Sequence, residues 1–234
     1  MPAVTVKQSP IQPLPSTLPS TVPSTLPTVE TFHSIQGEGI WTGASAFFIR
    51  LAGCEVGCPW CDTKHSWPMQ SHPQREIAAL VEEALAAQPF MVVITGGEPL
   101  MHDLTHLCAA LRQQGLRVHL ETSGSSPLTG EFDWITLSPK RFKPPLDAIY
   151  SQIHELKIVV GDEADLGWAE WAATQLAAHA SRPNDPSDHW LDGPKKMLQP
   201  EWNSEQGQTL VFDYVRLHPD WRVSLQTHKF LGIR

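Results

Sequence analysis

The chain has 234 residues, of which 41% are hydrophobic and 18% charged, and its formal net charge is −8. This length suits one substantial α/β domain, and no apolar run approaches the roughly 20 residues that span a bilayer. The acidic balance argues against broad attraction to nucleic acid, so we expect a small-molecule ligand and neither a membrane nor a nucleic acid as partner.

Residues 1–28 are rich in proline, serine and threonine, and a Pro-Ser-Thr theme begins at Pro15 and returns at Pro19 and Pro23. Each proline removes a backbone donor and fixes φ, which predicts a disordered or extended tail. The N-terminus also lacks the charged start, apolar core and small-residue cleavage site of a secretory signal. We therefore expect a cytoplasmic protein.

Apolar runs alternate with helical patterns from Val29 onward, which predicts one α/β domain over 29–234 with a mostly parallel sheet covered by helices. Strands are predicted at 46–52, 91–95, 116–121, 134–137, 156–160, 196–199 and 221–225. Helices are predicted at 73–87, 104–113, 164–178 and 203–217. Because these helices are too few for eight full units, we expect an incomplete (βα) barrel.

Polar motifs follow the predicted strands at the point where each strand ends. In parallel α/β folds, ligands gather at the carboxyl ends of the strands. The motifs therefore predict one site at this edge of the sheet. They lie at 54, 96–99, 121–124, 138–140 and 199–200.

Three of the four cysteines, Cys54, Cys58 and Cys61, share one short loop, and Cys108 lies in a helical pattern. This is not a disulfide framework, and Cys108 is interpreted as a buried apolar residue. Three soft thiolates on a turn rich in glycine and proline can surround one metal centre. They favour a 4Fe-4S cluster with one open iron, while a zinc site with His65 as fourth ligand stays open as an alternative.

Two further features support a cofactor and substrate site beside this loop. The Gly-Gly-Glu-Pro run at 96–99 permits close backbone approach to a ligand, and Glu98 offers acceptors to an ammonium group. Arg50 interrupts an apolar strand, where a charge needs a partner, and its guanidinium can bind a substrate carboxylate through two N–H donors. A plain turn and a surface ion pair are the respective alternatives.

The sequence at this point resembles the radical S-adenosylmethionine (SAM) superfamily, whose members carry C-x3-C-x2-C with an aromatic residue before the last cysteine, here Trp60. More narrowly, residues 29–234 are similar to its 7-carboxy-7-deazaguanine synthase family, because several motifs occur in the order typical of that family. They are SIQGEG at 34–39, FIRLAGC at 48–54, CDT at 61–63, TGGEP at 95–99, ETSG at 121–124, SPK at 138–140, ELK at 155–157 and QTHK at 226–229.

This resemblance implies the radical-mediated ring contraction of 6-carboxy-5,6,7,8-tetrahydropterin to 7-carboxy-7-deazaguanine, with loss of ammonia, in queuosine or deazapurine biosynthesis. It implies a 4Fe-4S cluster, SAM and Mg²⁺ as cofactors, an electron donor such as flavodoxin or ferredoxin, and a homodimer of radical SAM-type partial barrels. No side chain is assigned as catalytic, and His228 is interpreted as a packing or hydrogen-bonding residue.

The resemblance also assigns site residues. The metal ligands are Cys54, Cys58 and Cys61 for the cluster and Thr63 for magnesium. The SAM-binding residues are Trp60, Cys61, Asp62, Gly97, Glu98, Glu121, Ser123, Ser138, Pro139, Lys140, Gln199, Pro200, Glu201 and Trp202. The substrate-binding residues are Ile35, Gln36, Gly37, Arg50, Thr95 and Arg234, the last through its terminal carboxylate.

Two rival functions remain at this point. A glycyl-radical activase would share the cysteine loop and the Gly-Gly-Glu-Pro run, but it would not require the motifs at 34–39 and 226–229. A zinc-stabilised binding module would use His65 to complete a four-ligand site.

Overall fold

The computed structural model describes residues 23–179 and 193–233, which form a nine-stranded sheet in the order β3-β1-β2-β4-β5-β6-β7-β8-β9. Strands β2 and β4 to β9 pair in parallel, and β1 and β3 add an antiparallel edge. The strand bounds are β1 Thr25–Ile35, β2 Ser45–Leu51, β3 Gln74–Glu76, β4 Met91–Gly96, β5 Val118–Thr122, β6 Trp134–Leu137, β7 Glu155–Val160, β8 Lys195–Pro200 and β9 Trp221–Val223.

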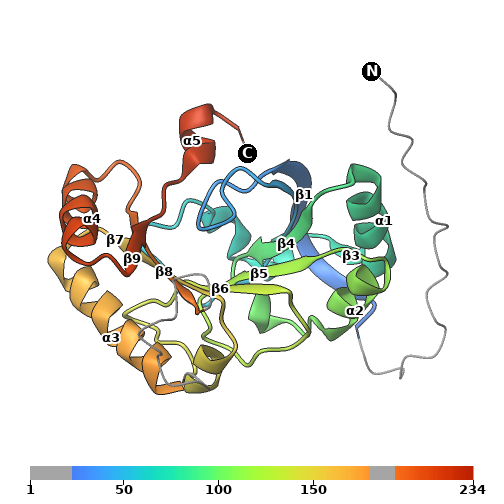
Figure 1. Ribbon diagram of the computed structural model, residues 1–234. Coiled ribbons are helices and arrows are strands. Elements are labelled where there is room, and N and C mark those ends of the chain that lie inside the picture. Colours follow the sequence, from blue (N-terminus) through green and yellow to red (C-terminus); the bar gives the residue numbers. More distant parts are fainter. Residues whose placement is uncertain (1–22, 180–192, 234) are drawn as a thin grey trace.

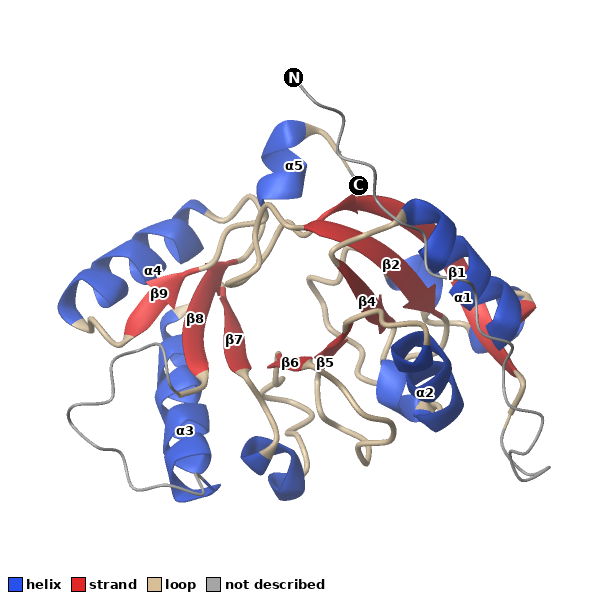
Figure 2. Cartoon of the chain, turned by 45° about the vertical axis from the view of Figure 1, so that its right-hand side comes forward, coloured by secondary structure: helices blue, strands red, loops and turns tan. Residues whose placement is uncertain are grey.

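The helices connect successive strands and lie outside the curved sheet, whereas α5 lies over the open side of the arc (Figures 1 and 2). Their bounds are α1 Ile77–Ala87, α2 Thr105–Gln113, α3 Glu163–His179, α4 Glu205–Leu217 and α5 Thr227–Leu231. None of the helices in the described ranges has the length and apolarity needed to cross a bilayer.

The hydrophobic core fills the layer between the sheet and its helices. Strand β4 contributes Val92 and Ile94, which are fully buried, and α2 contributes Leu107 and Leu111 from one helical face. Central parallel strands are covered on both sides, so β4 forms an almost continuous apolar run. Polar motifs follow at the carboxyl ends of several strands.

The predicted partial barrel is confirmed, because the described sheet has β3 and β9 as its edges and does not close on itself. A loop spanning 36–44, between β1 and β2, crosses the open side. The amide of Gly39 donates to Ser224 Oγ at 2.9 Å, and the amide of Thr227 donates to the Gly37 carbonyl at 2.9 Å. Side-chain and backbone contacts therefore join two ends of the sheet that no strand pairing joins.

Strand β1 begins at Thr25, four residues before the expected start of the domain at 29. Leu26 is only 2% exposed. Pro27 lacks a donor, yet its carbonyl accepts from the amide of Ala52 at 2.9 Å, so a proline fits at this place in the strand. The rest of the predicted tail, 1–22, lies outside the described residues.

Other element boundaries shift by a few residues. The helix predicted at 73–87 begins at Ile77, because residues 74–76 pair with β1 as strand β3. The strand predicted at 221–225 ends at Val223. Strand β1 and the short helix α5 were not predicted, since the first resembles the tail and the second has only five residues.

Candidate functional site

Two adjoining pockets open at the carboxyl ends of the strands. The larger, of about 310 Å³, is lined by the cysteine loop and by the ends of β4 to β8. The smaller, of about 210 Å³, lies between the 36–44 loop and strands β1, β2 and β4. The pockets share a wall that includes Glu38, Thr95 and Glu121. A cofactor and a substrate bound in the two pockets would therefore be neighbours.

The cysteine loop follows β2 and is fixed at both ends by backbone hydrogen bonds. The amide of Cys54 donates to the Trp67 carbonyl at 3.2 Å, and the amide of Glu98 donates to the Gly53 carbonyl at 2.8 Å. A Cβ atom at Gly97 would lie 2.2 Å from that Gly53 oxygen. Only glycine therefore allows the 96–99 run to lie this close to the loop.

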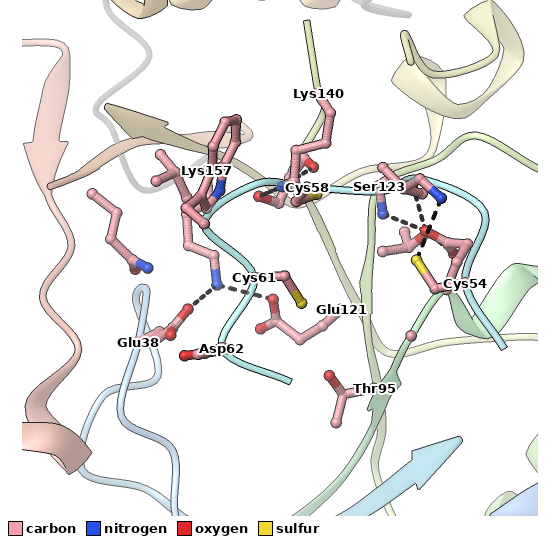
Figure 3. A pocket seen from close by; sticks show the side chains of 18 of the residues that line it. Glu38, Cys54, Cys58, Cys61, Asp62, Thr95, Glu121, Ser123, Lys140 and Lys157 are labelled. Carbon is pink, nitrogen blue, oxygen red and sulfur yellow. Dashed lines mark hydrogen bonds and ion pairs between the residues drawn. The ribbon is translucent and has the colours of Figure 1, made fainter. Parts of the chain in front are cut away.

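All three loop cysteines are free thiols that line the larger pocket (Figure 3). Burial, together with the nearby Cys61 and Cys54, raises the pKa of Cys58, while Lys140 opposes that rise. Three soft donors without a fourth protein ligand suit a cluster that keeps one position open.

A closed zinc site is not supported. His65 is exposed and is absent from the wall of the larger pocket. Within residues 23–179 and 193–233, no three or more His, Cys, Asp and Glu side chains are grouped so that they could hold a metal ion. A zinc ion needs four ligands drawn close around one point, whereas an iron–sulfur cluster places its thiolates farther apart. The donor set therefore fits a cluster better than a zinc ion.

Glu98 is surrounded by protein donors, which differs from our expectation that it offers free acceptors. Its Oε1 accepts from the amide of Leu100 at 3.0 Å and from the Thr122 hydroxyl. Its Oε2 accepts from the amide of Ser123 at 2.8 Å and from the Ser123 hydroxyl. An ionised carboxyl group has about four acceptor sites, so Glu98 here holds the end of β5 against the 96–99 run.

A buried lysine lies under the shared wall. Nζ of Lys157, whose side chain is 4% exposed, is 2.6 Å from Glu38 Oε2 and 3.0 Å from Glu121 Oε2 (Figure 3). Burial alone would lower the pKa of Lys157, yet Glu121, Glu38 and Glu155 raise it well above its usual value. The lysine is therefore charged, and it holds one carboxylate from the loop and one from β5.

The two carboxylates titrate in opposite directions. Burial opposes ionisation of Glu38, but Lys157, Gln226 and His228 lower its pKa from 4.5 to about 2. Burial and the charge of Glu38 raise the pKa of Glu121, and Lys157 only partly offsets that rise. Glu38 was not among the predicted site residues, although its place within the SIQGEG motif could have indicated it.

Arg50 lines the smaller pocket and has a structural partner as well. Its Nε donates to Glu30 Oε1 at 3.0 Å, and the side chains are 17% and 22% exposed. The antiparallel register of β1 and β2 places Glu30 opposite Arg50. The ion pair that was the alternative interpretation of Arg50 is thus present but partly buried, and the same arginine also lines the smaller pocket.

Most of the predicted residues are brought together. The smaller pocket contains the predicted substrate residues 35–37, Arg50 and Thr95 together with Thr63, and Arg234 lies outside the described residues. The predicted SAM residues line the larger pocket, with two exceptions. Pro139 turns its carbonyl to Trp168 Nε1 at 3.3 Å, and Pro200 is paired within β8.

Comparisons with known proteins agree with this geometry. Residues 48–156 match the model of the Radical SAM superfamily. A 7-carboxy-7-deazaguanine synthase of Synechocystis sp. is 53% identical over 205 residues, covering 88% of this chain and 92% of that protein. The protein of the same name from Escherichia coli K12 is 35% identical, covering 87% and 97%. A crystal structure of QueE from Escherichia coli superposes with a TM-score of 0.69 and 32% identity, covering 87% and 95%.

Proposed function

We infer the reaction of this chain from its family, because the chain belongs to the 7-carboxy-7-deazaguanine synthase family of radical SAM enzymes. The reaction is the conversion of 6-carboxy-5,6,7,8-tetrahydropterin into 7-carboxy-7-deazaguanine with loss of ammonia. The observation that carries this function is the pair of adjoining pockets, one lined by three thiols and the other by Arg50 and the 36–44 loop. An activase would need room for a polypeptide substrate, whereas the smaller pocket suits a bicyclic ring.

Cys54, Cys58 and Cys61 would hold a 4Fe-4S cluster, and the remaining residues of the larger pocket would hold SAM. When bound, these groups supply the radical that abstracts hydrogen from the substrate. Lys140, whose Nζ donates to the Ser138 carbonyl and hydroxyl at 2.6 Å, fixes the end of β6 beside the cysteine loop. Lys140 and Ser138 would thus help to orient the cofactors in the larger pocket.

Thr63 is our proposed magnesium ligand. It lines the smaller pocket, and its hydroxyl lies 3.5 Å from Cys61 Sγ, at the boundary between the thiols and the substrate space. A hydroxyl oxygen suits a hard cation that keeps several waters and binds substrate oxygens. Thr63 would thus hold magnesium beside the space proposed for the substrate.

The substrate carboxylate would bind the terminal nitrogens of Arg50, because Glu30 already occupies Nε. Gln36, Gly37 and Thr95 border the ring on the other sides. Arg234, which is also predicted to contact the substrate, lies outside the described residues.

We further propose a homodimer, a cytoplasmic location that keeps the thiols reduced, and a flavodoxin or ferredoxin as electron donor. The deciding experiment is anaerobic incubation of the reconstituted protein with the carboxy-tetrahydropterin, SAM and a reductant, followed by mass spectrometry. We expect 7-carboxy-7-deazaguanine and released ammonia. If the protein shows a full cluster spectrum and cleaves SAM but leaves this pterin unchanged, it catalyses a different reaction.

A further inference from the structure

Glu155 begins strand β7 and belongs to a sequence motif that the proposed function does not use. Its side chain is among the most buried acidic groups of the described chain, since the residue is 1% exposed. Lys157, two positions later, carries the ion pairs beneath the pockets. Glu155 lines neither of the two site pockets, so its role is exerted through other residues.

Glu155 contacts the 36–44 loop directly. Its Oε2 accepts from the amide of Ile40 at 3.1 Å. A Cβ atom at Gly39 would lie 2.2 Å from Oε1, and Gly39 has a φ of +65°, so glycine is required there on two grounds. The Gly39 amide is bound on its other side to Ser224 Oγ, which donates to Gln199 Oε1 at 2.8 Å.

The loop is therefore held at a single turn against neighbouring strands at one end of the sheet. Glu155 on β7 bonds one residue of the turn, and Ser224, which follows β9 and bonds Gln199 on β8, bonds the other. The residues immediately before this turn, Gln36 and Gly37, border the smaller pocket. If the contacts that hold this turn changed, the part of the loop that borders the smaller pocket would move.

The charge balance around Glu155 favours its neutral form. Its Oε1 has no hydrogen-bond partner among the described residues. Lys157 is its nearest strand neighbour of opposite charge, but that ammonium group already bonds Glu38 from the loop and Glu121 from β5. From β8, Lys195 pairs with Glu155 in backbone register, while its Nζ donates to the Gly193 carbonyl at 2.6 Å.

These surroundings also set the titration of the group. Burial and the negative charges of Glu121 and Glu38 raise the pKa of Glu155 to about 7, against the opposing effects of Lys157 and the Ile40 amide. Because the folded state binds this proton more tightly than the unfolded chain, the neutral form is held below neutral pH and lost as the pH rises through about 7.

We propose that Glu155 is a positioning residue, which in its neutral form seats the 36–44 loop for substrate and on ionisation weakens the binding of the anionic substrate. This inference rests on the proposed function for the identity of the substrate. Ionisation would place a third carboxylate beside Glu38 and Glu121 with one ammonium group among them. The added negative charge repels both Glu38, which belongs to the loop, and the anionic substrate.

The test compares E155Q and E155A with the unchanged protein and with E131Q, a control whose side chain is 88% exposed. Substrate KM and kcat are measured from about pH 6 to about pH 8.5, on both sides of the pKa of about 7. Glutamine keeps an acceptor for the Ile40 amide but cannot ionise, so E155Q should have a KM near that of the unchanged protein at low pH and lose the rise at high pH. E155A should have a KM about tenfold higher even at low pH, since the loop loses a hydrogen bond and its packing partner.

A second measurement needs neither cofactor nor substrate. In hydrogen–deuterium exchange, the peptide covering 36–44 should be less protected, relative to its intrinsic exchange rate, in E155A than in the unchanged protein. In E155Q this protection should stay the same across the pH range. The inference is overturned if E155Q keeps the pH dependence of KM, or if E155A matches the unchanged protein in both KM and exchange. Absence of product from the unchanged protein would instead refute the proposed function, and the exchange result would still decide the role of Glu155 in the loop.

Discussion

Replacing Lys157 with methionine removes the only cation that bonds both Glu38 and Glu121 in the described structure. Methionine has a similar length and no charge, so the change isolates the ammonium group from the packing of the side chain. Two carboxylates would remain under the pockets without this partner. We expect the variant to fold with reduced stability at neutral pH and to recover relative to the unchanged protein in acid.

The magnitude follows from Glu38. Its pKa is lowered from 4.5 to about 2, and at about 1.4 kcal/mol for each unit this corresponds to roughly 3 kcal/mol of stability. A depressed carboxyl pKa stabilises the fold above about pH 4.5, and this contribution is lost as the pH falls through about 2. Removing one partner of a buried ion pair typically costs about 3–5 kcal/mol, which agrees with this figure.

The assay is chemical denaturation of the cofactor-free protein at several pH values, with K157M compared with K196M. Lys196 lies on the neighbouring strand β8 and pairs with Asp220, whose side chain is 60% exposed, so its loss should cost at most about 1 kcal/mol. Adding E38Q to K157M should restore part of the stability. The reasoning fails if K157M is as stable as K196M at neutral pH, or if its deficit persists unchanged when the carboxylates are protonated.

Three further predictions concern the pockets. Alanine at any cysteine of the 54–61 loop should abolish iron binding and product formation, whereas C108A, which changes a buried thiol in α2, should keep both. Iron analysis and turnover measurements test this prediction, and full activity in a loop variant would count against the cluster. R50K should weaken substrate binding by about 1–3 kcal/mol, because an ammonium group cannot reproduce the fork, with SAM affinity unchanged in calorimetry; an equal loss for SAM would place Arg50 outside the substrate pocket. E98Q should destabilise the fold by about 1–3 kcal/mol in thermal unfolding. The NH2 group of the new glutamine would face a backbone N–H that now donates to a carboxylate oxygen of Glu98. An unchanged melting temperature would contradict the role assigned to Glu98.

The strand-end site could be predicted from sequence because its signals are local. The three cysteines lie within eight positions, and each remaining motif follows an apolar run that forms a strand. Parallel strands carry such motifs to one edge of the sheet whatever the exact strand bounds are. The predicted residues of both pockets therefore came together although several boundaries shifted.

The supports of the site could not be predicted in this way. The contact of Ile40 with Glu155 joins residues 115 positions apart, and that of Gly39 with Ser224 spans 185 positions. The partner of Arg50 depends on the antiparallel register of β1, a strand whose proline and threonine content resembles the preceding tail. The saturation of Glu98 likewise depends on donors that β5 supplies from elsewhere in the chain.

The contacts of the 36–44 loop with residues far along the chain also set an order in which parts of the structure can form. During synthesis the chain emerges from its N-terminus, so the loop and the cysteines exist long before Gln226 and Thr227, which bond to Glu38 and Gly37 across 188 and 190 positions. The cysteine loop can therefore form before these contacts do. The 36–44 loop gains its contacts with Gln226 and Thr227 only after that later segment has been synthesised.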